Sequence, residues 1–304
     1  MGKKALYILL FLVVALALMI GGITWWNKRE GKGRGAHAVV QALQRVDFAR
    51  VNTIEIKKGG DDLTIVQEGG LWRVEGKRAD AKKVREALDA LRTSSFQGPL
   101  SRKPENIERL GVGGEGLSVS LGGDATHFSF IVGKRGPVFE SSYVRLESSD
   151  EVFLANTDLP QVFPVTADVW RSKTIVDIDP VTVAAVEYRT RGELAKTYRK
   201  EGETWQVIIG ATSTTTDSTT VKKLLDVMHL LKASGFVDGE KERDAFERER
   251  VQGVSVTVLN SSGAAVGEMI FLKKKDIWWV RAKGDDQVYT LSSSLAAQLE
   301  LPTR

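Results

Sequence analysis

Hydrophobic and polar residues alternate in two widely separated stretches, residues 63–74 and residues 196–207, which share one outline. Each stretch contains a strand-like run, then a turn with glycine, and then a second strand-like run that contains a tryptophan near its start, Trp72 or Trp205. Alternation with a period of two, broken by a glycine turn, is typical of a β-hairpin. The pattern therefore predicts a structural unit that occurs twice in the chain.

The first copy is expected to form a module over residues 47–172. After Asp80, a residue that can cap a helix, apolar residues recur at the helical spacing i, i+3, i+4 and i+7 and predict one long amphipathic helix. These residues are Val84, Ala87, Leu88 and Leu91. A short helix is expected over residues 104–110 and a helical tail over residues 159–170. Strands are expected at residues 51–56, 63–66, 117–121, 128–132, 143–146 and 152–154.

The second module is expected over residues 173–304 and repeats this order. Its long helix is predicted from Leu224, Val227, Met228 and Leu231, with Asp217 or Ser218 as the cap and a loop over residues 212–220. Strands are expected at residues 254–258, 269–272, 279–281 and 288–291.

The fold class that follows is α+β. Each module should contain a mainly antiparallel sheet with one longer packed helix and short helices. Trp72, Trp205 and Trp279 alternate within strand patterns, so we expect all three in the core.

The N-terminal region is expected to anchor the chain in a membrane. Residues 5–23 are nineteen residues without a charge, and at about 1.5 Å per helical residue they span roughly the hydrocarbon core of a bilayer. We predict a single transmembrane signal anchor over residues 1–26, with Trp25 and Trp26 at the membrane interface. A cleaved signal peptide is the alternative, but no small-x-small cleavage site closes the apolar run. A basic, glycine-rich stalk follows over residues 27–46 and includes a short helix at residues 38–45.

The orientation of this anchor has two readings. Four basic residues follow the apolar run and two precede it, so a count of flanking positive charges places the C-terminal side in the cytoplasm. A very short basic tail before an apolar run instead resembles a bacterial signal anchor. We favour the second reading, in which the modules of a single-pass inner-membrane protein face the periplasm.

Composition excludes several classes of function. The net charge is +4, but six of the basic residues and one acidic residue precede residue 35, which leaves 37 basic against 38 acidic residues. This balance gives no support to a nucleic-acid-binding surface, which has to neutralise phosphates. Because the chain has no cysteine, disulfides, thiol catalysis and cysteine-based zinc sites are excluded.

A family resemblance follows from these motifs. The anchor precedes a strand–Gly–Trp hairpin, an Ala-Asp-x-x-Lys-Val helix start at residues 79–84, a Leu-Gly link to residues 117–121, and Tyr-Val-Arg-Leu and Val-Phe-Leu-Ala strands at residues 143–146 and 152–155. In this order the chain resembles the bacterial family catalogued as domain of unknown function 4340. The resemblance implies a membrane-anchored protein that accompanies components of gliding-motility-type ABC transporters, and it implies no catalytic residue. The second copy departs from the pattern, since its long helix starts within residues 214–220 without the Ala-Asp cap.

Few residues are candidates for catalysis or for metal binding. The histidines are His37, His127 and His229, and none has a second histidine or a cysteine at metal-ligand spacing. His229 adjoins the apolar stripe, so we interpret it as a residue at the edge of the core. The glycine-rich run 111–116 follows a helix, precedes a strand and lacks a Lys-Ser/Thr pair, so it is interpreted as a turn. We therefore predict no catalytic residue, no metal site and no bound cofactor.

Basic residues cluster at one place in each module. Lys134 and Arg135 in the first module, and Lys273, Lys274 and Lys275 in the second, are expected at the same hairpin tip. The simpler interpretation is a solvated turn that protects a strand edge. The functional interpretation is contact with anionic lipid or with an acidic partner.

Three classes of function remain. The first, which we favour, is a non-enzymatic membrane-anchored scaffold that docks on other envelope proteins, with ABC-transporter subunits as the partners that the family resemblance implies. The second is a ligand-binding protein or enzyme with a site between the modules, built from residues scattered in sequence. The third is an adaptor that faces the cytoplasm.

Overall fold

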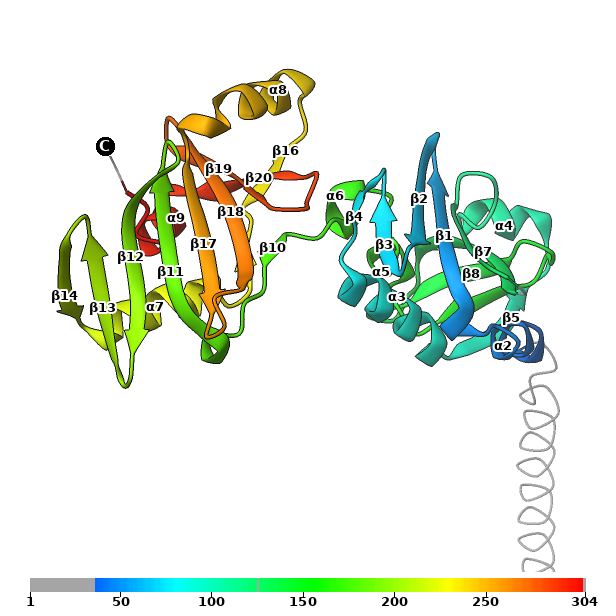
Figure 1. Ribbon diagram of the computed structural model, residues 1–304. Coiled ribbons are helices and arrows are strands. Elements are labelled where there is room, and N and C mark those ends of the chain that lie inside the picture. The colour runs from blue at the N-terminus through cyan, green and yellow to red at the C-terminus, as the bar shows by residue number, and fades with distance from the viewer. Residues whose placement is uncertain (1–35, 125, 303–304) are drawn as a thin grey trace, which may run out of the picture. The chain divides into compact units, whose positions relative to one another are not determined.

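The computed structural model describes residues 36–124 and 126–302. The chain separates into two compact units, of which the first ends at Trp170 and the second begins at Arg171 (Figure 1). Within the described ranges, no helix has both the length and the apolar character needed to cross a bilayer. The predicted anchor at residues 5–23, with Trp25 and Trp26, lies outside these ranges.

The first unit contains mostly short strands and two helices of nine or more residues. Its elements are α2 (Ala36–Gln44), η1 (Phe48–Arg50), β1 (Val51–Lys58), β2 (Asp61–Glu68), β3 (Leu71–Val74), β4 (Lys77–Arg78), α3 (Ala81–Thr93), β5 (Phe96–Ser101), α4 (Pro104–Arg109), β6 (Leu117–Gly123), β7 (Thr126–Arg135), β8 (Ser142–Leu146), β9 (Val152–Ala155), α5 (Leu159–Val162) and α6 (Ala167–Trp170).

The second unit follows the same plan with a few additions. Its elements are β10 (Thr174–Val176), η2 (Pro180–Thr182), β11 (Val183–Thr190), β12 (Glu193–Glu201), β13 (Thr204–Ile209), β14 (Thr212–Thr216), α7 (Ser218–Met228), β15 (Leu231–Lys232), β16 (Gly235–Val237), α8 (Glu240–Glu249), η3 (Arg250–Gln252), β17 (Val254–Asn260), β18 (Ala265–Lys274), β19 (Ile277–Ala282), β20 (Val288–Ser292) and α9 (Ser293–Gln298).

Each unit is built on a nine-stranded antiparallel sheet, and the two sheets have the same strand order. The first runs β4-β3-β2-β1-β6-β7-β8-β9-β5 and the second β14-β13-β12-β11-β17-β18-β19-β20-β16. The hairpin registers also agree, because Trp72 pairs with Gln67 and Trp205 pairs with Lys200, in each case two positions from the glycine turn. The α+β class with two large antiparallel sheets is therefore as predicted, and the strands repeat in order.

The core of the first unit lies between one face of the sheet and α3. Asp80 accepts hydrogen bonds from the backbone N–H groups of Lys82 and Lys83 and so caps α3. The buried side chains of α3 are the four residues of the predicted stripe. Residues of α2 and Trp170 of α6 pack into the same cluster, so the sequence identified this face of the helix correctly.

The corresponding helix of the second unit ends earlier than predicted. Asp217 caps α7, and its buried residues are Val221, Leu224, Leu225 and Met228. Val227 is only half-buried, and Leu231 lies in β15. The helix ends because Leu230 adopts a left-handed backbone conformation with φ of +62°, which turns the chain into β15.

A second helix in this unit corrects the expectation of one longer helix per module. α8 packs through the fully buried Phe246 against Leu272, Val288 and Val237. Leu272 points away from the main core, whose β18 residues are Met269 and Phe271. α8 therefore covers the opposite face of the sheet.

The tryptophan predictions meet different outcomes. Trp205 is buried in the main core, and the half-buried Trp72 packs against the core of the first unit. Trp279 packs with the small cluster under α8, while its neighbour Trp278 enters the main core. The alternation in β19 is thus offset by one residue from the predicted one.

Two further segments differ from the sequence prediction. The helical tail at residues 159–170 is divided into α5 and α6, because Pro164 has no N–H to continue a helix. Residues 212–216, expected as a loop, form the edge strand β14. Its side chains are almost all exposed threonine and serine, so no apolar alternation marked it as a strand.

Candidate functional site

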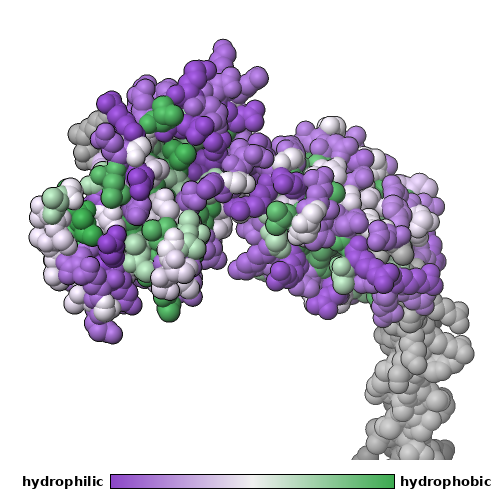
Figure 2. Space-filling view, in the orientation of Figure 1, coloured by the Kyte–Doolittle hydropathy of each residue, from purple (hydrophilic) through white to green (hydrophobic). Residues whose placement is uncertain are grey.

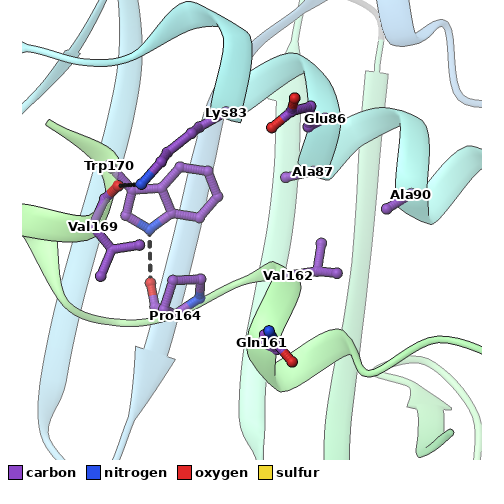
Figure 3. Close-up of a pocket in the computed structure, with 9 residues that line it drawn as sticks. All are labelled: Lys83, Glu86, Ala87, Ala90, Gln161, Val162, Pro164, Val169 and Trp170. Atoms are coloured by element: carbon purple, nitrogen blue, oxygen red, sulfur yellow. Dashed lines mark hydrogen bonds between the residues drawn. The ribbon is translucent and has the colours of Figure 1, made fainter. Parts of the chain in front are cut away.

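A pocket of about 380 Å³ lies beside α3 in the first unit (Figure 3). We call it the first groove. Its apolar lining comes from α3, α5, α6 and the segment between them, and consists of Ala87, Ala90, Val162, Pro164, Val169 and Trp170. Lys83, Glu86 and Gln161 are exposed and complete the lining.

Hydrogen bonds hold the walls of the first groove in place. Trp170 donates from its indole Nε1 to the backbone oxygen of Pro164 at 2.7 Å, and Lys83 donates from Nζ to the backbone oxygen of Val169 at 2.6 Å (Figure 3). The backbone N–H of Asp80 donates to the oxygen of Trp170 at 2.7 Å. The groove is therefore formed before any ligand or partner binds.

The second unit has a pocket of about 490 Å³ at the equivalent position, which we call the second groove. The third, sixth and tenth residues after the capping residue of the long helix line the groove in both units, where the caps are Asp80 and Asp217. In the first groove these are Lys83, Glu86 and Ala90, and in the second they are Thr220, Lys223 and Val227. The remaining lining of the second groove is mostly polar and consists of Asp226, Ala297, Gln298 and Glu300.

A polar cluster borders the second groove. Tyr198 donates a short hydrogen bond to the carboxylate of Glu300, and Lys196 lies 3.2 Å from the same carboxylate oxygen. The Lys196 ammonium also lies 4.8 Å from the ring centroid of Tyr188 and 4.9 Å from that of Tyr198. Tyr188 donates to the backbone oxygen of Leu299 at 2.8 Å. These contacts fasten the segment after α9 to β11 and β12.

The electrostatics of this cluster favour neutral phenols. Burial raises the pKa of Tyr188 well above its ordinary value, and Tyr198 and Glu300 add to this shift. Burial also raises the pKa of Tyr198, with further contributions from its hydrogen bond to Glu300 and from the charge of that carboxylate. A phenol that stays protonated donates a hydrogen bond and does not act as a nucleophile or base at neutral pH.

A second buried polar cluster surrounds Arg171 at the start of the second unit. Its guanidinium donates two bonds of 2.7 Å to the carboxylate of Asp238 and one of 2.5 Å to Gln287, and it lies 3.7 Å from the ring centroid of Phe236. Arg171 is only 6% exposed. This fork-like pairing ties the start of the unit to β16 and to the segment before β20.

The basic residues singled out in the sequence lie at equivalent strand connections, β7–β8 and β18–β19. Two of them are engaged within their own unit: Arg135 pairs with Asp158 at 2.7 Å, and Lys274 pairs with Glu249 at 2.8 Å. Lys134, Lys273 and Lys275 are exposed. Their contact with lipid or an acidic partner stays a prediction.

The histidines that the structure describes in full lie apart from one another. His127 is exposed on β7, and its Nε2 lies 3.2 Å from the Ser129 hydroxyl. His229 directly follows the buried Met228, and its side chain is 59% exposed. Its Nδ1 lies 3.6 Å from Asp177 and 3.3 Å from the backbone oxygen of the core residue Ile178, which fits a position at the edge of the core. Within residues 36–124 and 126–302, no group of three or more histidine or acidic side chains is arranged to hold a metal ion.

Sequence reasoning missed both grooves and both polar clusters. Lys196 and Glu300 are 104 positions apart, and Arg171 and Gln287 are 116 apart. A linear pattern cannot reveal such pairs. The grooves had one available signal, the small residues Ala87 and Ala90 on one side of α3, which leave room beside a helix.

A comparison with protein-family models identifies the family to which the chain belongs. The family described as "Domain of unknown function (DUF4340)" matches residues 72–252, more than half of the chain. The protein belongs to this DUF4340 family. The matched range runs from the first tryptophan hairpin to the η3 turn before β17, so this DUF4340 protein matches its family across parts of both units. Searches of curated proteins and of solved structures gave no match.

Proposed function

We propose that this DUF4340 protein is a membrane-anchored, non-enzymatic docking protein of the bacterial envelope. Residues 1–26 anchor it in the inner membrane, and its two units face the periplasm. Its partners are other envelope membrane proteins, and the resemblance stated above makes ABC-transporter subunits the first candidates.

The observation that carries this proposal is the divergence of the two grooves. They occupy one position in a duplicated architecture, but the first is mainly apolar and the second carries Lys223, Asp226 and Glu300. A duplicated scaffold with two surfaces of different chemistry suits the recognition of different partners. The described linings of the two grooves contain no serine, cysteine or histidine, so they give no support to catalysis by a nucleophile activated by a histidine base.

The charge balance supports the same proposal. After residue 35 the chain has 37 basic and 38 acidic residues, and most of the face in Figure 2 is hydrophilic, with separate hydrophobic spots. This surface suits specific protein contacts through small apolar areas with polar rims.

The test is isolation of the tagged full chain from membranes in mild detergent, with quantitative mass spectrometry of the proteins that accompany it. A Lys223→Glu change reverses a charge in the second groove and is expected to lower recovery of one membrane protein by about tenfold, equivalent to about 1.4 kcal/mol. Lys222→Glu is the matched control, because Lys222 is exposed on the same helix outside the groove. Equal recovery with both variants, or a chain that is always isolated alone, would contradict the proposal.

A further inference from the structure

We propose that the first groove receives the β7–β8 loop of a second copy of this chain. The loop comprises residues 136–141, and the side chains that enter the groove are Val138 and Phe139. This inference rests on the proposed docking role of the first groove and names its partner.

The loop presents a strongly exposed apolar tip. Phe139 is 88% exposed and Val138 is 63% exposed. An aromatic side chain on a protruding loop loses much unfavourable contact with water when it enters a pocket. Aromatic residues are also enriched among those that dominate binding at protein interfaces.

The loop is held in one conformation before it binds. The Gly136 N–H donates to the oxygen of Ser141 at 2.8 Å, and both the N–H and the hydroxyl of Ser141 donate to the oxygen of Val138. A Cβ at Gly136 would lie 2.4 Å from the Ser141 hydroxyl oxygen and 2.5 Å from a Leu154 methyl carbon, so a larger residue there would displace these side chains. At the base of the loop, Arg135 pairs with Asp158 at 2.7 Å. A preorganised loop loses little conformational entropy on binding.

The first groove matches this tip in size and polarity. Its volume of about 380 Å³ accommodates one aromatic and one aliphatic side chain, and its lining is mainly Ala, Val, Pro and Trp. Ala87 and Ala90 of α3 lie across from Val162 in Figure 3 and keep the space between α3 and α5 open. In a single chain Phe139 is exposed, so it does not fill its own groove.

Apart from the paired Arg135, the loop region and the groove each carry one basic and one acidic residue, so a contact between copies can pair opposite charges. Lys134 precedes the loop and Glu140 lies within it, while Glu86 and Lys83 line the groove. Contact between copies would oppose Lys134 to Glu86 and Glu140 to Lys83. The charges of Lys134 and Glu140 cancel and Arg135 is already paired with Asp158, so the loop lacks the excess positive charge that an anionic bilayer would select.

Both halves of the contact belong to the same unit of one chain. A reciprocal exchange, in which each copy inserts its loop into the other, closes a two-fold dimer. A one-way exchange forms an open chain of copies instead. Both arrangements bring Phe139 of one copy next to Ala90 of another.

Absence of cysteine makes this contact directly testable in the full chain. Two differently tagged chains, one with Glu140→Cys, which keeps Phe139 beside the new thiol, and one with Ala90→Cys, are mixed in mild detergent and oxidised. Disulfides form only when the two Cα atoms come within about 7 Å, so we expect a disulfide-linked product that carries both tags. The control replaces the first chain with Leu71→Cys, a variant at a residue that is 54% exposed, and should give at least about tenfold less product.

A charge exchange supplies the second arm. Glu86→Lys should weaken self-association of the full chain in detergent by about tenfold, measured as molar mass against concentration, and Lys134→Glu in the same chain should restore it. Phe139→Ser should weaken it as well, and Leu71→Ser should not.

Two results would overturn the inference. The first is no mixed-tag product together with unchanged molar mass in the variants, and the second is a crosslinking label at position 140 that reacts with lipid or with a different protein only. Neither result bears on the Lys223→Glu test, which reports on the second groove. Failure of this inference is thus distinguishable from failure of the proposed function.

Discussion

Tyr198, Glu300 and Lys196 show how single residues hold the second unit together. The phenol donates to the carboxylate and the ammonium lies against both, so removal of one member leaves the others with unmet hydrogen bonds. None of the three is marked by sequence pattern, because Tyr198 alternates like any strand residue and Glu300 follows the last helix. Their partnership depends on the fold that brings β12 and the C-terminal segment together.

This cluster predicts a specific loss of stability in alkali. The folded protein raises the pKa of Tyr198, so folding favours the neutral phenol. The neutral phenol contributes fully to the free energy of unfolding below the pKa of tyrosine in the unfolded chain, which is about 10. This contribution is lost as the pH rises from there toward the pKa of Tyr198 in the folded protein. The midpoint of thermal unfolding, measured on the full chain in detergent from about pH 8 to about pH 11, should therefore fall more steeply in the wild type than in Tyr198→Phe. Parallel curves would show that Tyr198 is not protected from ionisation.

At the scale of elements, local signals were reliable where a cap and an apolar stripe coincide. α3 has both, and its cap and four buried residues were predicted correctly. In α7 the stripe appeared to continue to Leu231, because the pattern cannot show that Leu230 takes a left-handed conformation. α8 was not predicted, since its ten residues include Phe246 as their one buried side chain and the rest are mostly charged. Short or polar elements are fixed by the neighbours they pair with, which a local pattern does not contain.

The helix caps provide a matched pair for measurement. Asp80 accepts from two backbone N–H groups, at 3.0 and 3.3 Å, while Asp217 accepts from one at 3.0 Å. Asp80→Ala should lower the free energy of unfolding by about 1 kcal/mol, and Asp217→Ala by a similar or smaller amount. Hydrogen exchange should speed up in the first turn of α3 in the first variant and of α7 in the second. An effect spread over the whole unit, or none, would contradict the role of these aspartates as local caps.

At the scale of the whole molecule, duplication was the most predictable feature. The tryptophan hairpins lie in the same place in each sheet, and the strand order of one sheet repeats in the other. Function is harder to predict from the sequence, because each groove is formed by a helix, α3 or α7, and a segment about 75 residues farther along the chain. Only folding brings these segments together, and only then does the difference between an apolar and a polar groove appear.

The orientation of the proposed anchor gives the last prediction. Residues 28–34 contain four basic residues and residues 3–4 contain two, so the charge rule alone would retain the units in the cytoplasm. We expect export, because the proposed docking on the periplasmic parts of envelope proteins needs the units on that side of the membrane. A reporter that is active only in the periplasm, fused after Arg304, should be active, and a cytoplasm-only reporter at the same place should be inactive. Replacing Lys28, Arg29, Lys32 and Arg34 with Ser should leave or increase the periplasmic signal, since it removes the only charges that oppose export. The reverse pattern of reporter activity would place the units in the cytoplasm, and the docking partners would then have to be sought on that side of the membrane.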